Sequence, residues 1–176
     1  KQPVIPDYTV SILDFGGVGD GGTLNTESFA NAMKHLAKKG GGKLIVPAGI
    51  WLTGPIQFEN CTELHVEQGA LVLFTTDFDE YPIVTSIYEG NTAQKKMAPL
   101  WAYEKHDVAI TGTGAFDAQG QAWRPSKKGK FTESQWKELT SGKGIEMKNV
   151  WYPDAKDDGL AGKPGKPDMR RVTQRP

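Results

Sequence analysis

The spacing of apolar residues predicts one helix near the start of the chain. Between residues 26 and 39, apolar side chains recur at the spacing of one helical face, at Phe29, Met33, Leu36 and Ala37. Asn25 suits the N-cap, and the glycines at 40–42 suit the end of the helix. A single amphipathic helix of this length must cover an apolar surface.

Most of the chain from residue 43 to residue 117 alternates short apolar runs with glycine and proline. The runs cover residues 43–46, 50–52, 56–58, 63–66, 70–74, 100–103, 107–111 and 115–117. Each has the length of a strand. None approaches the roughly 20 residues that a membrane helix needs, so we expect no membrane partner.

A repeat in this region predicts the architecture. The stretch beginning at Glu63 matches the one beginning at Asp107, with offsets of 44 from Leu64 to Val108 and 45 from Gly69 to Gly114. Half of this offset, about 22 residues, is close to one turn of a solenoid, and Leu44 precedes Leu64 by 20. We therefore predict an all-β chain folded as a right-handed parallel β-helix, with the N-terminal helix as its cap.

The predicted domain is single and covers residues 1–176. It comprises an N-terminal segment with the capping helix (1–42), the coils (43–117) and a long loop excursion (118–176). The excursion is rich in Lys, Gly, Pro and Trp, and only residues 136–139 suggest a helical turn. No closing coil follows, so we expect the chain to be a fragment.

Composition removes several classes of function. Lys and Arg number 21, as do Asp and Glu, and this balance argues against a nucleic-acid partner that needs a broad basic surface. The 21 glycines and 11 prolines favour many turns. The single cysteine, Cys61, excludes an intrachain disulfide framework and is interpreted as a small buried residue.

Three segments carry a resemblance to a known family. Residues 14–26, followed by a helix, resemble the start of pectin-lyase-like β-helix proteins, and residues 41–49 resemble the strand that follows. Residues 108–120, together with Trp123, are similar to glycoside hydrolase family 28, the polygalacturonases. The resemblance implies inverting hydrolysis of a pectin-like, galacturonate-containing polysaccharide by two carboxylates about 6.5–9.5 Å apart. It also implies a secreted or periplasmic protein that is a monomer at full length.

No catalytic residue is transferred from the family to this chain. The family's Asn-Thr-Asp, tandem Asp, His-Gly and Arg-x-Lys motifs find no match, so we expect the catalytic residues beyond residue 176 and this chain alone to be inactive. Asp157-Asp158 lies in a Gly/Pro-rich loop and is interpreted as a solvated turn, and Asp117 as a turn carboxylate.

Aromatic and cationic residues of the excursion suggest contact with substrate. Sugar rings stack on aromatic faces, and uronate carboxylates pair with Arg or Lys. The residues proposed for this role are Trp123, Arg124, Lys127 and Trp151. Alternatively, the tryptophans pack the loop onto the solenoid. For Trp101 and Tyr103, which share one face of a strand, packing in the core is expected.

The three histidines give no sign of a metal. His35 is expected to be solvated, His65 to face outward, and His106 to precede a strand, and no pair has metal-ligand spacing. We expect no metal and no cofactor. Two other functions remain open: a polysaccharide lyase or other β-helix depolymerase, and a non-catalytic carbohydrate-binding or tailspike-like module.

Overall fold

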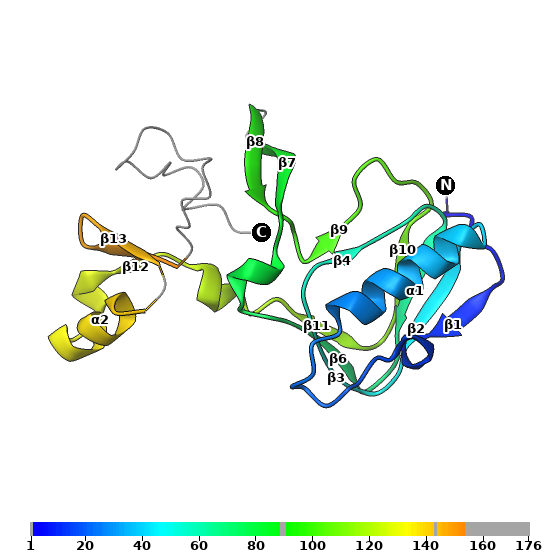
Figure 1. Cartoon of the computed structure of the whole chain (residues 1–176), viewed down its shortest axis with the longest axis horizontal. Helices are drawn as coiled ribbons and strands as arrows, with labels where there is room; N and C mark the ends of the chain where they lie inside the picture. The colour runs from blue at the N-terminus through cyan, green and yellow to red at the C-terminus, as the bar shows by residue number, and fades with distance from the viewer. Residues whose placement is uncertain (1, 89–90, 143, 154–176) are drawn as a thin grey trace. The chain divides into compact units, whose positions relative to one another are not determined.

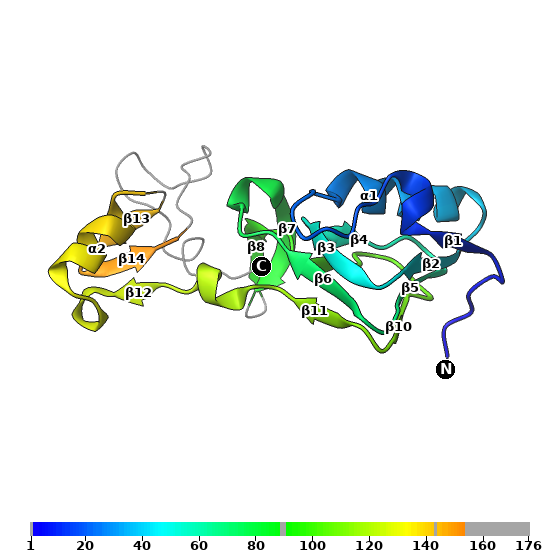
Figure 2. The ribbon, with the colours of Figure 1, turned by 90° about the horizontal axis from the view of Figure 1, so that it is seen from below.

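The computed structural model describes residues 2–88, 91–142 and 144–153. The chain divides into two compact units, one formed by Lys1–Tyr81 with Ala98–Ala118 and the other by Pro82–Met97 with Gln119–Pro176. Figures 1 and 2 show the helices and strands of both. In the first unit, every described pair of strands is parallel.

The first unit contains three parallel sheets. The largest orders its strands β1, β2, β5 and β10, which are Thr9–Ser11, Gly42–Val46, Thr62–Val66 and Ala109–Gly112. The second orders β11, β6 and β3, which are Ala115–Asp117, Ala70–Phe74 and Gly49–Thr53. The third pairs β4 with β9, which are Ile56–Gln57 and Leu100–Trp101. Because the chain visits the sheets in turn and stacks each passage beside the last, it follows the path of a parallel β-helix, as predicted.

Alternating side chains of these strands fill the core. Leu44 pairs with Leu64 and Val46 with Val66 in register between β2 and β5, and all four are buried. Full burial of such a side chain contributes about 1.5–3 kcal/mol. The stacking of like residues in successive coils therefore contributes to the stability of the first unit.

The predicted repeat gives the correct strand register for one coil and the wrong register for the next. The 20-residue step from Leu44 to Leu64 is one coil. However, Leu64 pairs with Ile110 and not with Val108, and Leu71 pairs with Ala115. Strands β5 and β10 are direct neighbours. The segment between them is thus one long coil with an insertion, where the offset had suggested two regular coils.

Helix α1 (Thr26–Lys38) confirms the predicted helix, with Asn25 at the N-cap position and glycines after its last turn. Phe29, Ala32, Met33 and Leu36 are buried in the same cluster as the strand residues, whereas Ala37 is exposed. Its end has the hydrogen bonds of a Schellman motif: the N–H of Gly40 donates to the carbonyl of Ala37, and the N–H of Gly41 to that of Leu36. Two 3-10 helices, η1 (Ile12–Phe15) and η2 (Phe78–Glu80), complete this unit.

The second unit contains antiparallel strands. Strands β7 (Ile83–Tyr88) and β8 (Asn91–Lys96) form a hairpin. Strands β12 (Ser126–Lys127), β14 (Val150–Tyr152) and β13 (Ile145–Met147) form a three-stranded sheet in that order. The helices are η3, η4 and α2, which cover Gly120–Trp123, Lys128–Lys130 and Glu133–Thr140.

The predicted helical turn at 136–139 is part of α2. A capping box joins Thr132 and Gln135 at its start, and Trp136 is buried with its ring 5.9 Å from that of Phe131. The three strands of this segment had not been predicted. Among the described residues, no helix is long and apolar enough to span a membrane.

Candidate functional site

Polar side chains gather on the outer face of the largest sheet. Since side chains of β5 alternate between core and surface, Glu63 and His65 face outward, as predicted for His65. Glu63 Oε1 lies 3.2 Å from Lys43 Nζ of β2 and accepts a 2.5 Å hydrogen bond from Thr111 Oγ1 of β10. His65 Nδ1 lies 2.6 Å from Thr111 Oγ1. One hydrogen-bonded row therefore crosses three successive coils.

Glu63 is the acceptor at the centre of this row. Partial burial raises the pKa of its carboxyl, but the hydrogen bonds from Thr111 and Lys43 and the positive charge of Lys43 outweigh burial and hold the pKa below its usual value. Glu63 is therefore ionised at neutral pH. It is suited to accepting hydrogen bonds from hydroxyl groups and unsuited to protonating a leaving group.

A shallow, open pocket lies at the end of this row. His65, Glu67, Gln68, Gly112 and Thr113 line it. Gly112 has φ 93°, and a side chain there would overlap the carbonyl of Val66, so the backbones of the two coils approach closely beside the pocket.

An aromatic pair, Trp101 and Tyr103, stands at the end of β9. The rings of Trp101 and Tyr103 are stacked, with centroids 6.0 Å apart and planes inclined by 14°. Tyr103 is 57% exposed, so the expectation that it packs in the core is wrong. The alternation of Trp101 and Tyr103 was visible in the sequence, but it indicates only a shared face and not which face meets solvent.

Of the residues predicted to contact substrate, Trp123 and Arg124 lie at the end of η3. Trp123 is 5% exposed, which leaves little of its ring for a sugar. Arg124 is exposed and forms the C-cap of η3. The guanidinium group of Arg124 is thus the more accessible of the two for a ligand, and the role of Trp123 stays a prediction.

Lys127 and Trp151 lie on paired strands but on opposite faces. In the antiparallel pair β12–β14, Ser126 stands opposite Trp151 and Lys127 opposite Val150. Since cross-strand partners share a face, Lys127 and Trp151 point to different sides. Trp151 is half-buried and Lys127 exposed. The structure therefore does not bring these two together on one surface.

Two further residues of the first unit, His35 and Cys61, differ from their sequence interpretations. His35, expected to be solvated, is half-buried between Tyr8 and Phe15, and its Nε2 lies 3.0 Å from Tyr8 Oη. Cys61, expected to be buried, is half-buried and has φ 57°, because it occupies a tight turn before β5. Asp157-Asp158 lies outside the described residues.

The comparisons with known proteins bear on the parallel coils. No protein-family model matches the chain. A probable polygalacturonase from Vitis vinifera is 33% identical over 155 residues, which cover 81% of this chain and 32% of that protein. The crystal structure of a hyperthermoactive exopolygalacturonase from Thermotoga maritima matches with TM-score 0.67 and 37% identity, covering 80% of this chain and 33% of that one. The resemblance to polygalacturonases is confirmed.

A third similarity concerns the family. A family 28 exopolygalacturonase from Yersinia enterocolitica matches with TM-score 0.58 and 26% identity, over 64% of this chain and 21% of that one. By the coverages given above, this chain spans about a third of the length of its Vitis vinifera and Thermotoga maritima relatives. The parallel coils and the family agree with the expectation drawn from residues 14–26, 41–49 and 108–120.

Proposed function

We propose that the protein containing these coils is a glycoside hydrolase that cleaves a pectin-like, galacturonate-containing polysaccharide. The observation that carries the proposal is the identity of 33% and 37% to polygalacturonases over about four-fifths of the chain. A parallel β-helix alone would give only a prior on function, because one fold hosts many activities.

The proposed reaction inverts the anomeric centre. One carboxyl group protonates the leaving oxygen and another carboxylate activates water, with about 6.5–9.5 Å between them. We place these groups on coils beyond residue 176, because the Asn-Thr-Asp, His-Gly and Arg-x-Lys patterns find no match in the sequence and its tandem Asp pair lies in a Gly/Pro-rich segment. Glu63 is unsuited to the role of the acid, since its lowered pKa favours the ionised form over a proton donor.

Helix α1 is proposed to cap a right-handed coil stack. Its buried face joins the cluster formed by the first coils, and its residues Phe29 and Leu36 are fully buried there. A solenoid without such a cover would expose apolar side chains and unpaired backbone at its first coil. The cap therefore serves stability and solubility, not catalysis.

Substrate contacts are proposed for Trp123, Arg124, Lys127 and Trp151 in the second unit and, separately, for the stacked pair Trp101 and Tyr103 in the first unit. Exposed Arg124 and Lys127 offer cations for uronate groups, and the exposed ring of Tyr103 offers a stacking face. Because such a polymer is too large to cross a membrane, we propose that the protein is secreted or periplasmic and works as a monomer.

The test is release of reducing ends from polygalacturonate by the full-length protein, with a neutral galactan as control polymer. Hydrolysis of polygalacturonate alone is expected. An unsaturated, ultraviolet-absorbing product would replace the proposal with a lyase, and binding without any product would replace it with a non-catalytic module.

Arg124→Ala is expected to weaken binding of oligogalacturonates about tenfold, the loss of one charge-assisted hydrogen bond. Lys34→Ala, which removes an exposed cation on α1, is the matched control and should leave binding unchanged. Equal affinity of wild type and Arg124→Ala would remove Arg124 from the substrate site.

A further inference from the structure

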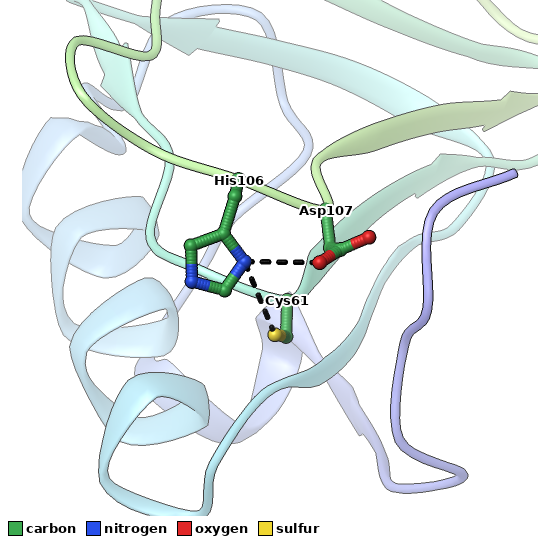
Figure 3. A group of neighbouring side chains, drawn as sticks. All are labelled: Cys61, His106 and Asp107. Carbon is green, nitrogen blue, oxygen red and sulfur yellow. Dashed lines mark hydrogen bonds and ion pairs between the residues drawn. The ribbon is translucent and has the colours of Figure 1, made fainter. Parts of the chain in front are cut away.

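Three potential metal ligands from two neighbouring coils meet at one point of the first unit. Cys61 lies just before β5, and His106 and Asp107 lie just before β10 (Figure 3). One donor atom from each lies within 4.8 Å of the other two. His106 Nδ1 stands 2.9 Å from Asp107 Oδ2 and 4.0 Å from Cys61 Sγ. We propose that this cluster is a binding site for a zinc-class divalent cation.

The register of the coils produces this meeting. Ala109 pairs with Glu63, so two residues earlier Asp107 stands opposite Cys61. Both residues have left-handed backbone angles, with φ 57° at Cys61 and φ 52° at Asp107. Turns at the equivalent position of two successive coils therefore project their side chains side by side. Because Cys61 and His106 are 45 apart in sequence, the usual short ligand spacing of a sequence motif is absent.

Backbone contacts hold the turns in place independently of any ion. The N–H of Cys61 donates to the carbonyl of His106 at 3.0 Å, and the N–H of His106 donates to Asn60 Oδ1 at 3.1 Å. Asp107 Oδ1 accepts from the N–H of Val4 at 2.9 Å, which leaves Oδ2 directed at His106. Orientation of one carboxylate oxygen by a second contact is a feature of metal ligands in general.

The arrangement suits ligation better than nucleophilic catalysis. In a thiol–imidazole–carboxylate triad, the thiol faces one ring nitrogen and the carboxylate the other, so that the ring relays a proton. Here Cys61 Sγ and Asp107 Oδ2 both lie near His106 Nδ1 (Figure 3). Donors that surround one point on the same side of a ring favour a shared cation.

Distances and donor types fit zinc. Bond lengths of about 2.0–2.3 Å in a tetrahedron separate ligand atoms by about 3.3–3.6 Å, and the two separations from His106 Nδ1, 2.9 and 4.0 Å, lie on either side of that range. The His106 side chain is 65% exposed, so its ring can turn, and solvent can supply a fourth ligand. Thiolate with imidazole selects zinc-like ions over magnesium and calcium, which prefer oxygen donors.

The experiment is a titration of the chelator-treated, thiol-reduced chain with Co²⁺ and then Zn²⁺. We expect one equivalent of Co²⁺ to give a thiolate-to-cobalt charge-transfer band in the near ultraviolet, which Zn²⁺ removes. Cys61 is the sole cysteine of the sequence, so the band reports on that residue alone. Zn²⁺ should also raise Tm, because it binds the folded turns together.

Variants separate the site from general thiol binding. Cys61→Ser should abolish the band, and His106→Gln and Asp107→Asn should each weaken affinity about tenfold or more. Asn keeps an acceptor for the N–H of Val4 and tolerates the left-handed backbone, so Asp107→Asn should fold normally. The matched control is His65→Gln, which alters another outward-facing histidine and should leave affinity unchanged.

The proposal is overturned by any of three results. The first is no band at one equivalent of Co²⁺ when circular dichroism reports a folded chain. The second is a band that persists unchanged in His106→Gln and Asp107→Asn, which would reveal binding by the thiol alone. The third is a stoichiometry of one ion per two chains, which would reveal bridging between cysteines of different molecules. None of these readouts depends on hydrolase activity.

Discussion

At the scale of single residues, Asn25 illustrates how a correct local prediction can miss the main role. It occupies the N-cap position of α1, but its side chain makes no capping hydrogen bond. Its Oδ1 accepts from the N–H of Val18 at 2.7 Å, and its Nδ2 donates to the carbonyls of Val18, Thr23 and Leu52. Asn25 is 1% exposed. It therefore fastens the N-terminal loop to β3, a long-range role that no local signal reports.

Asp20 organises the adjacent turn and should make stability depend on pH. Its carboxylate accepts hydrogen bonds from the N–H groups of Thr23 and Gly22 and from the Thr23 hydroxyl, which lower its pKa from 3.8 to about 2. Because the folded-state pKa is depressed, the ionised group contributes stability that is complete above about pH 4 and is lost as the pH falls towards 2.

The measurement is the urea midpoint of wild type and Asp20→Asn across this pH range. Wild type should be the more stable protein at neutral pH, and the difference should vanish as the pH falls through about 2, where the wild-type carboxyl becomes protonated. Asp7→Asn, at another exposed aspartate, serves as the control substitution. A constant difference between wild type and Asp20→Asn at all pH values would contradict the assigned role of the charge.

At the scale of elements, local pattern predicted well where local contacts dominate. The spacing of Phe29, Met33 and Leu36 was sufficient for α1, because one helical face and its ends lie within a short stretch of sequence. Strands β12 and β14 could not be predicted in the same way. They contain two and three residues, and pairing between segments this far apart leaves no periodic signal.

In the candidate site, too, local features could be predicted from the sequence and contacts between coils could not. The outward direction of His65 follows from alternation within β5 and was predicted. The partners of Glu63, which are Lys43 and Thr111, come from neighbouring coils, and so does His106 beside Cys61. Their contacts depend on the register between strands. The sequence repeat aligned Leu64 with Val108, two residues before its true partner Ile110, and so would have misplaced these contacts.

Gly112 at the end of β10 should be sensitive to substitution. Its φ is 93°, and a Cβ there would lie 2.7 Å from the carbonyl carbon of Val66 and closer still to its oxygen. Gly112→Ala is expected to destabilise the fold by about 1–3 kcal/mol from backbone strain, with the overlap adding to this.

Gly22→Ala is the matched control for that variant. A Cβ at Gly22 meets only Asp20 Oδ1, at 3.9 Å, so thermal stability should stay near that of wild type. It could rise slightly, because alanine lowers the conformational entropy of the unfolded chain. Thermal melts followed by circular dichroism compare the three proteins. If Gly112→Ala had the same Tm as wild type, close approach of the coils at this glycine would not be required for stability.

At the scale of the whole molecule, the repeat was misread because an insertion has nearly the length of a coil. The connection from the end of β6 at Phe74 to the start of β9 at Leu100 contains the β7–β8 hairpin, and its length imitated an additional turn of the solenoid. The buried cluster of the first unit draws its fully buried members from Ile12 to Phe74. Within the described residues, the hairpin therefore adds nothing to that cluster.

This organisation predicts that the hairpin can be removed. The N–H of Met97 donates to the carbonyl of Pro82 at 2.8 Å, so the two ends of the insertion meet and a short glycine linker can join them in place of residues 83–96. A connection of about half the length costs roughly 0.6 kcal/mol less to close, and we expect Tm to stay within a few degrees of wild type or to rise slightly.

The control replaces residues 83–96 by a Gly/Ser segment of equal length, which separates loss of the hairpin from loss of chain length. Both variants should retain a cooperative melt and the strand signal in circular dichroism. A loss of cooperativity in both would mean that the first unit needs the hairpin to fold. In that case the segment from Thr75 to Pro99 would have to be counted as part of the coil stack and not as an insertion into it.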